Sequence, residues 1–173
     1  MPADVPQLIE LMRESVLRLF PAFYDERQTA SGAAHIAHLD NRLIEDGTYF
    51  VHEADGEIVA CGGWSRREKL YTGSGSLGDD DRLLDPATEP ARIRAMFVRQ
   101  DHTRRGLGRA ILEASERAAR DEGFRSLTLV ATLPGVPLYL AFGFVEIKRV
   151  PVEMPDGVTV EGVLMDRPIT ASG

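Results

Sequence analysis

The sequence contains little cysteine: Cys61 is the only one among 173 residues. One thiol cannot form an intramolecular disulfide, and a lack of disulfides is typical of a reducing compartment. Long hydrophobic runs are also missing, since no apolar stretch approaches the ~20 residues of a membrane-spanning helix. No basic segment followed by an apolar one opens the chain, so we expect no secretory signal. Together these absences predict a cytoplasmic protein without a membrane partner.

Positive charge is in deficit, because 20 lysines and arginines stand against 27 aspartates and glutamates, for a formal net charge of −7. Nucleic acid is a polyanion, so this balance argues against nucleic acid as a partner. The deficit is uneven, however, because six arginines and one aspartate fall between residues 92 and 109. This local excess indicates an anionic ligand, with a solvated basic face as the alternative.

A glycine turn lies within this basic segment. Residues 98–111 have the pattern of a strand end, a tight turn and an amphipathic helix. Gly106 and Gly108 remove side chains where the helix begins, so several backbone N–H groups can converge on one point. A helix N-terminus also has unpaired donors and a partial positive charge. Formal charge is added by three arginines, Arg104, Arg105 and Arg109. The combination predicts a site for a phosphate or pyrophosphate.

The rest of the chain predicts one mixed α/β domain over residues 1–173, with about six strands flanked by helices. Periodicity and capping residues predict helices over residues 4–20, from Ser31 to Gly47, 107–122 and 136–142. Apolar or alternating runs predict strands over residues 49–53, 57–65, 91–99, 127–132, from 144 onward, and 158–167. Strands 91–99 and 127–132 should be parallel, because a helix connects them. Residues 70–90 predict a long loop.

Three further patterns are weaker. The glycines of residues 73–78 have dinucleotide-loop spacing, but aspartates follow them instead of an apolar helix, so we reject that reading. His35 and His38 share a predicted helix without a third ligand at a suitable spacing, so we expect no metal site. Cys61 and Trp64 lie on a predicted strand and are expected in the core.

Two motifs follow one another between residues 91 and 144. The first is Gly106-Leu107-Gly108 at the strand–helix turn, and the second is Tyr139-Leu-Ala-Phe-Gly143-Phe144. In this order and spacing they resemble the GNAT superfamily of acyl-CoA-dependent N-acetyltransferases. The family's first motif is Arg/Gln-x-x-Gly-x-Gly/Ala, and its leading position falls on Thr103 here, with Arg104 and Arg105 directly after it.

The resemblance implies the GNAT fold and acetyl-CoA as a cosubstrate. Only three residues precede Asp4, so we expect the family's first strand to be absent. Family members hold the coenzyme A pyrophosphate on the amides of the turn. That role would fall to Thr103, Arg104, Arg105, Gly106, Leu107, Gly108 and Arg109. The pantetheine arm lies in a gap beside the strand before the turn, which would place it against Met96, Phe97 and Val98.

Acetyl transfer to an amine requires a neutral amine, a stabilised oxyanion and a proton for the departing thiolate. The resemblance implies that a backbone N–H of the strand before the turn stabilises the oxyanion. It also implies that Tyr139 is the general acid, with an aromatic packing residue as the alternative. A phenol has a pKa near 10, close enough to that of a thiol for this transfer.

No carboxylate lies on the strand where many relatives carry their general base. The candidates by proximity are Glu53, Glu68, Glu89, His35 and His38, each with an ordinary surface role as the alternative. Arg92 and Arg94 share one strand face, where they would bind an anionic group of the acceptor or pair with residues 79–81. Thr132 stands at about the position of an asparagine that contacts pantetheine in the family.

The partner implied by the resemblance is a small-molecule or peptide amine. Members of the family often form homodimers, so the resemblance also implies a homodimer. An alternative function is an acyl-CoA sensor of the same fold without turnover. A third is an assembly module that acts through an exposed sheet edge.

Overall fold

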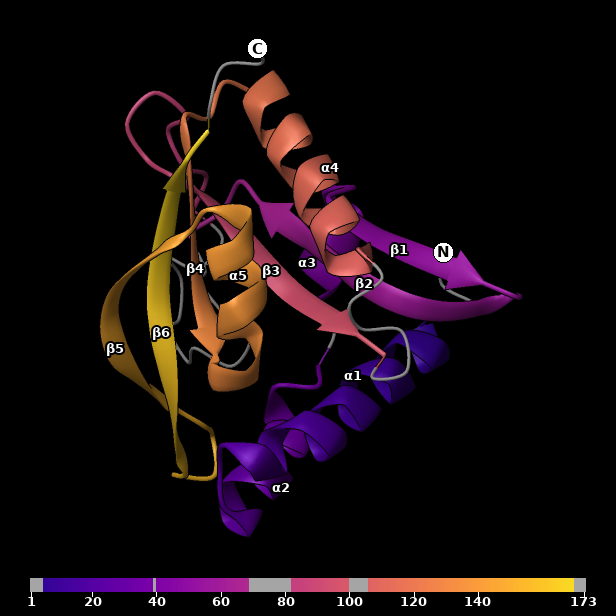
Figure 1. Ribbon diagram of the computed structural model, residues 1–173. Helices are drawn as coiled ribbons and strands as arrows, with labels where there is room; N and C mark the ends of the chain where they lie inside the picture. The colour runs from indigo at the N-terminus through magenta and orange to yellow at the C-terminus, as the bar shows by residue number, and fades with distance from the viewer. Residues whose placement is uncertain (1–4, 39, 69–81, 100–105, 170–173) are drawn as a thin grey trace.

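The computed structural model describes residues 5–38, 40–68, 82–99 and 106–169 (Figure 1). Its helices are α1 (Val5–Leu19), η2 (Phe20–Ala22), α2 (Glu26–His35), α3 (Asn41–Glu45), α4 (Leu107–Asp121), η4 (Leu133–Gly135) and α5 (Val136–Phe142). Its strands are β1 (Tyr49–Ala54), β2 (Glu57–Ser65), β3 (Ala91–Val98), β4 (Ser126–Thr132), β5 (Val145–Glu153) and β6 (Thr159–Pro168). This confirms the predicted mixed α/β class.

The six strands form one sheet in the order β1-β2-β3-β4-β6-β5. β3 and β4 are parallel, as predicted from the helix between them, and every other neighbouring pair is antiparallel. The β1–β2 hairpin turns on Asp55 and Gly56, whose φ angles of 53° and 79° suit a two-residue type I′ turn. The sheet therefore changes from antiparallel to parallel pairing at β3, in its middle.

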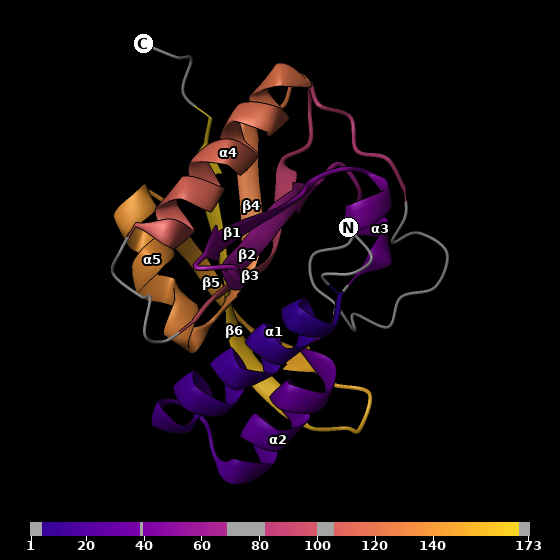
Figure 2. The same cartoon turned by 90° about the vertical axis from the view of Figure 1, so that its right-hand side faces the viewer.

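Helices cover both faces of this sheet (Figure 2). Successive residues of β4 point to opposite faces: Leu129 and Ala131 join the cluster that contains residues of α4 and α5, whereas Val130 packs against the cluster of α1. Both clusters are extensive, and the α1 cluster includes the fully buried Met12 and Val16. The two cores thus lie on opposite faces of the sheet, with β4 contributing side chains to both.

The prediction of one helix from Ser31 to Gly47 is wrong. α2 begins five residues earlier because Asp25 and Gln28 form a capping box, in which each side chain accepts a hydrogen bond from the other's backbone N–H (2.7 and 3.0 Å). It ends at His35, and a separate short helix, α3, begins after Asp40, whose carboxylate accepts from Arg42 N at 3.0 Å.

The predicted loop over residues 70–90 lies partly outside the described residues, and residues 67 and 83 pair as an isolated bridge beside it. In the described part of the chain, α1 is the first element and no strand precedes it. No helix within those residues is long and apolar enough to cross a membrane.

Candidate active site

A gap opens in the sheet between β3 and β4. The two strands pair only at Ala91–Leu127 and Arg92–Thr128, although β3 continues to Val98 and β4 to Thr132. A cavity of about 690 Å³ occupies this gap and is lined by residues of α1, α4 and α5 as well as of both strands. Backbone groups along the separated strands need partners, so an extended ligand with amides suits this space.

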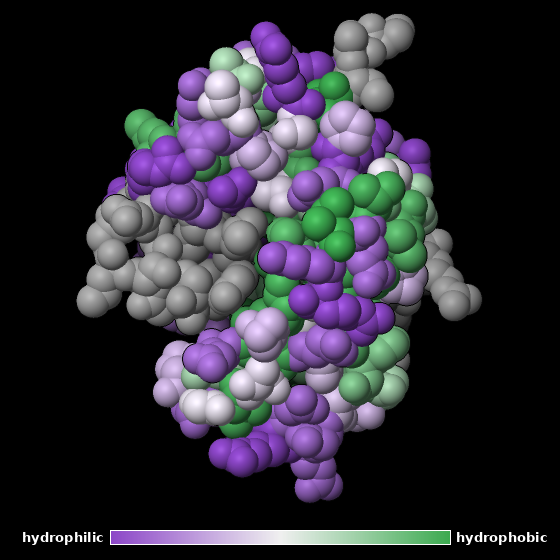
Figure 3. All heavy atoms as spheres, turned by 90° about the vertical axis from the view of Figure 1, so that its left-hand side faces the viewer, coloured by the Kyte–Doolittle hydropathy of each residue, from purple (hydrophilic) through white to green (hydrophobic). Residues whose placement is uncertain are grey.

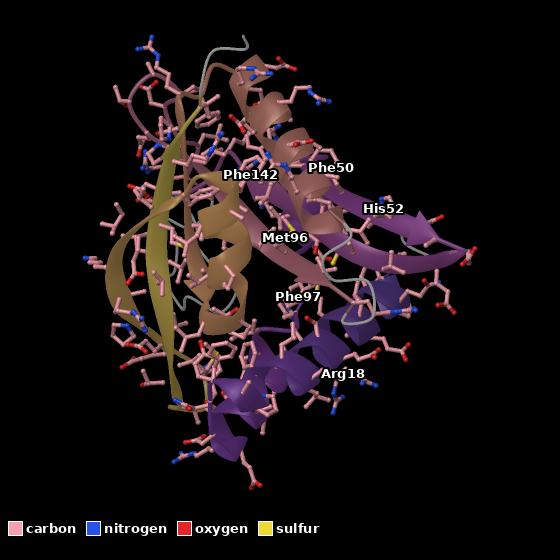
Figure 4. All side chains as sticks on the ribbon, in the orientation of Figure 1. Arg18, Phe50, His52, Met96, Phe97 and Phe142 are labelled. Carbon is pink, nitrogen blue, oxygen red and sulfur yellow. The ribbon has the colours of Figure 1, made fainter. Side chains whose placement is uncertain are left out.

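A bulge bends β3 inside the gap. Cys61 pairs with Phe97 and Gly63 with Arg94, so two residues of β3 stand against the single Gly62 of β2. One of these two is Ala95, which has a φ of 51°, a left-handed conformation that costs about 1–2 kcal/mol for a residue with a side chain. Beyond it, Met96 lies toward α4 and Phe97 toward α1 (Figure 4).

Tyr49, on the edge strand β1, holds this bulge. Its hydroxyl donates a hydrogen bond to Ala95 O at 2.7 Å, reaching past β2. Burial raises the pKa of Tyr49 well above its ordinary value, and burial raises the pKa of the neighbouring Cys61 thiol to about 12. Both groups stay neutral in the physiological range, so the contact does not depend on charge. Cys61 and Trp64 are fully buried, which confirms their predicted place in the core.

The glycine turn leads into α4 as predicted. Gly106 is the N-cap residue and has a φ of 77°. The first intrahelical bond runs from Ala110 N to Gly106 O, so the N–H groups of Leu107, Gly108 and Arg109 have no partner within the helix. A Cβ on Gly106 would meet no atom of the described residues within 4 Å, so none of them fills the space beside these donors.

Gly108 allows α4 and α5 to approach one another closely. A Cβ built there would lie 2.8 Å from Leu138 Cδ2, inside van der Waals contact. The Arg109 guanidinium instead extends along the exposed side of the helix, 3.2 Å from Glu113 and 5.5 Å from the centre of the Phe142 ring.

The structure gathers seven of the predicted coenzyme-binding residues around this one cavity: Met96, Phe97, Val98, Gly106, Leu107, Gly108 and Arg109. The other three, Thr103, Arg104 and Arg105, lie outside the described residues. Thr132 also lines the cavity.

Tyr139 faces the cavity from α5. Its ring packs edge-on against Phe144 at 5.7 Å between centroids, so it contributes to the core as well. Burial alone raises the pKa of its phenol above 10. No described residue hydrogen-bonds its hydroxyl. The phenol therefore stays protonated, and its O–H can donate a hydrogen bond or a proton to a group in the cavity.

Of the two arginines predicted to share a strand face, only Arg94 reaches the cavity. Arg94 is buried, and its Nη2 lies 3.1 Å from Asp40 Oδ2. Arg92 donates to the carbonyl oxygens of Glu68 and Pro90. Residues 79–81, the alternative partners, lie outside the described part of the chain.

None of the five candidate bases lines the cavity. Glu68 and Glu89 both bind Arg82, whose hydrogen bond lowers the pKa of Glu89 to about 2. His35 lies 3.6 Å from Asp156 on the protein surface. In the residues that the structure describes, no cluster of His, Cys, Asp and Glu could hold a metal ion.

The chain is similar to a known protein family in sequence and to known proteins in structure. The family model described as the acetyltransferase (GNAT) family matches residues 9–144. No curated protein matches the chain in sequence. Among solved structures, a GCN5-related N-acetyltransferase from Rhodopseudomonas palustris has a TM-score of 0.73 at 19% identity, over 97% of this chain and 91% of that one.

Two further structures are similar over almost their whole length. The PaiA N-acetyltransferase from Thermoplasma acidophilum, solved in complex with coenzyme A, has a TM-score of 0.66 at 15% identity, over 96% of this chain and 93% of that one. The ribosomal-protein-S18-alanine N-acetyltransferase from Escherichia coli has a TM-score of 0.56 at 20% identity, over 100% and 92%. At such identities these likenesses establish the fold.

Proposed function

Because the chain belongs to the acetyltransferase (GNAT) family, we propose that it is an N-acetyltransferase that transfers the acetyl group of acetyl-CoA to a primary amine of a small molecule or peptide. The observation that carries this proposal is the cavity in the β3–β4 gap. It joins the open amides of α4 to the opposite face of the sheet, beside α1. An acyl donor can enter from one face and an amine from the other.

Acetyl-CoA fits the residues on the α4 side. The N–H groups of Leu107, Gly108 and Arg109 would hold the pyrophosphate, and Thr103, Arg104 and Arg105 complete the proposed turn. The pantetheine amides would pair with the backbone of Met96–Val98, in the place that a neighbouring strand would otherwise fill. The apolar lining of the gap suits the methylene groups between those amides.

The proposed reaction is direct transfer. The amine lone pair attacks the thioester carbon, a C–N bond forms, and the C–S bond breaks with its electrons on sulfur. Tyr139 then donates its proton to the thiolate, while the proton lost by nitrogen passes to solvent and the phenol is reprotonated. A backbone N–H at the bulge of β3 would bind the oxyanion.

Thiol release from acetyl-CoA in the presence of a panel of amines tests this function. Tyr139→Phe should lower kcat while the calorimetric affinity for coenzyme A stays nearly unchanged, because only the proton donor is lost. Binding of coenzyme A without thiol release for any amine would instead favour a sensor. No heat with coenzyme A at all would refute both readings.

We also propose that the protein is a cytoplasmic homodimer. Figure 3 shows hydrophobic side chains gathered on the surface, where α5 and the edge strand β5 present the half-exposed Leu140, Val145 and Ile147. A patch of this kind on an edge strand is a common site of association. Val145→Glu should convert a dimer into a monomer in sedimentation experiments. A wild-type monomer at high concentration would contradict the proposal.

A further inference from the structure

The cavity has a second half, which acetyl-CoA in the proposed position would leave open. It lies on the α1 face of the sheet, beyond the bulge of β3, and its walls come from α1, η2, the C-terminal end of α2, β5 and β6. We infer that the acceptor bound there is a small primary amine attached to a branched or aromatic hydrocarbon group, and this inference rests on the proposed acetyltransferase function.

The walls of this half are mostly hydrocarbon, although Ser15 of α1 also lines the cavity. The hydrocarbon part is formed by the side chains of Val16, Leu19, Phe20, Ile36, Val152 and Val160. Val16 and Val160 are each 1% exposed, so both are fixed by the core behind them rather than free to move aside. The free energy falls when apolar surfaces of protein and ligand leave water to contact one another, so these walls favour a ligand whose body is hydrocarbon.

Formal charge on this face disfavours an acceptor with several amines. Arg94 is the charged side chain buried in this half, and it forms an ion pair with Asp40. The only carboxylate residue among the described lining residues is Glu161, whose side chain is half exposed and binds Arg149 at 3.1 Å. A second ammonium group would therefore enter a desolvated space where the described carboxylates, on Asp40 and Glu161, already bind arginines.

The same surroundings suit the form of the amine that reacts. Desolvation disfavours an ammonium ion relative to the neutral amine. The attacking nitrogen must be neutral, and none of the candidate bases lines the cavity. A hydrocarbon amine with one nitrogen becomes neutral on entering the cavity, and it has no second ammonium group that would be buried with its charge.

The test compares kcat/KM, from thiol release, for four probes: 2-phenylethylamine, 3-methylbutylamine, ethanolamine and putrescine. The two hydrocarbon amines should exceed the other two by at least tenfold. Turnover of ethanolamine or putrescine as fast as that of the hydrocarbon amines would overturn this inference and leave the acetyltransferase proposal standing. Coenzyme A binding without thiol release for any amine would overturn both.

Two valines of β6 provide a matched pair of variants. Val160 and Val163 are each 1% exposed, but only Val160 lines the cavity, whereas Val163 belongs to the cluster on the α4–α5 face. Val160→Ala should lower kcat/KM for 2-phenylethylamine about three- to tenfold, because hydrocarbon contact is lost, and leave that for ethylamine within twofold. Val163→Ala should not change the ratio of the kcat/KM values for 2-phenylethylamine and ethylamine.

An equal change of the ratio in both variants, or none in Val160→Ala, would contradict the assignment. Melting temperatures of both variants show whether they fold. If Val160→Ala does not fold, Phe20→Leu removes an aromatic wall of the same half from η2 and should lower the same ratio.

Discussion

Replacement of Tyr49 by phenylalanine removes one hydroxyl, and with it the 2.7 Å hydrogen bond that holds Ala95 O. The contact is partly buried, and a carbonyl left there without its donor costs about 1–3 kcal/mol. The bulge stores a further cost, because the left-handed conformation of Ala95 is unfavourable by about 1–2 kcal/mol. Without the hydroxyl, the strand can relax that strain only by giving up the bulge. Tyr49→Phe should therefore lower the free energy of unfolding by about 1–3 kcal/mol and move the backbone at Met96.

The assay combines urea unfolding with steady-state kinetics. We expect Tyr49→Phe to lower kcat about tenfold, because the oxyanion donor is displaced, while coenzyme A affinity changes little. A tenfold loss of rate corresponds to about 1.4 kcal/mol of activation free energy. Ala95→Gly in the same chain should restore kcat, because glycine holds a positive φ without strain. Thr128→Val is the control: it removes a buried hydroxyl that lies 2.6 Å from Asp166 Oδ1, away from the cavity.

This control should lose stability and keep its turnover. Wild-type stability and turnover in Tyr49→Phe would refute this role of Tyr49. An equal loss of activity in Thr128→Val and Tyr49→Phe would refute it as well.

Three further predictions follow from the same structure. Gly106→Val and Gly56→Val both place a side chain at a positive φ, where no described atom lies within 4 Å of the new Cβ. Each variant should therefore lose about 1–2 kcal/mol of stability. Only Gly106→Val should weaken coenzyme A binding in calorimetry, by tenfold or more. Because burial raises the pKa of Tyr139, kcat/KM should show no alkaline fall below pH 10. The rising limb of the pH profile should shift with the basicity of the acceptor amine. A rising limb at the same pH for all acceptors would indicate a base supplied by the protein. The hydrogen bond from Arg67 lowers the pKa of Asp46 below 3.8, so its stabilisation is present above that pH and lost as pH falls through the lowered pKa. Asp46→Asn should thus cost about 1–2 kcal/mol at pH 7 in denaturant unfolding and less at pH 3, and an equal cost at both would contradict the ion pair.

The part of the fold that sequence predicts well is the part held by local interactions. The turn at Gly106, the parallel pairing around α4 and the short helix that carries Tyr139 all follow from glycine positions and periodicity within a few residues. The second helix is the exception, because its capping box of Asp25 and Gln28 is also local but lies before the apolar residues whose spacing predicts a helix. That signal was present in the sequence and could have been read.

Contacts between distant residues could not be read from the sequence. Tyr49 and Ala95 are 46 positions apart, and Asp40 and Arg94 are 54 apart. Tyr24 likewise binds Glu161 O and Leu133 N across more than 100 positions. No pattern in a single chain pairs such residues, because their meeting depends on the order of strands in the sheet. The bulge that Tyr49 supports was invisible for this reason.

The contact of Gly108 with Leu138 links two parts of the cavity that would otherwise vary independently. Leu138 directly precedes Tyr139, so any side chain at position 108 would push on the turn that carries the proposed proton donor. A substitution of Gly108 that reshapes the diphosphate end should therefore also disturb the chemistry. The acceptor half has no such tie to α4 among the described residues, which leaves it the region of this protein most open to evolutionary or engineered change of substrate.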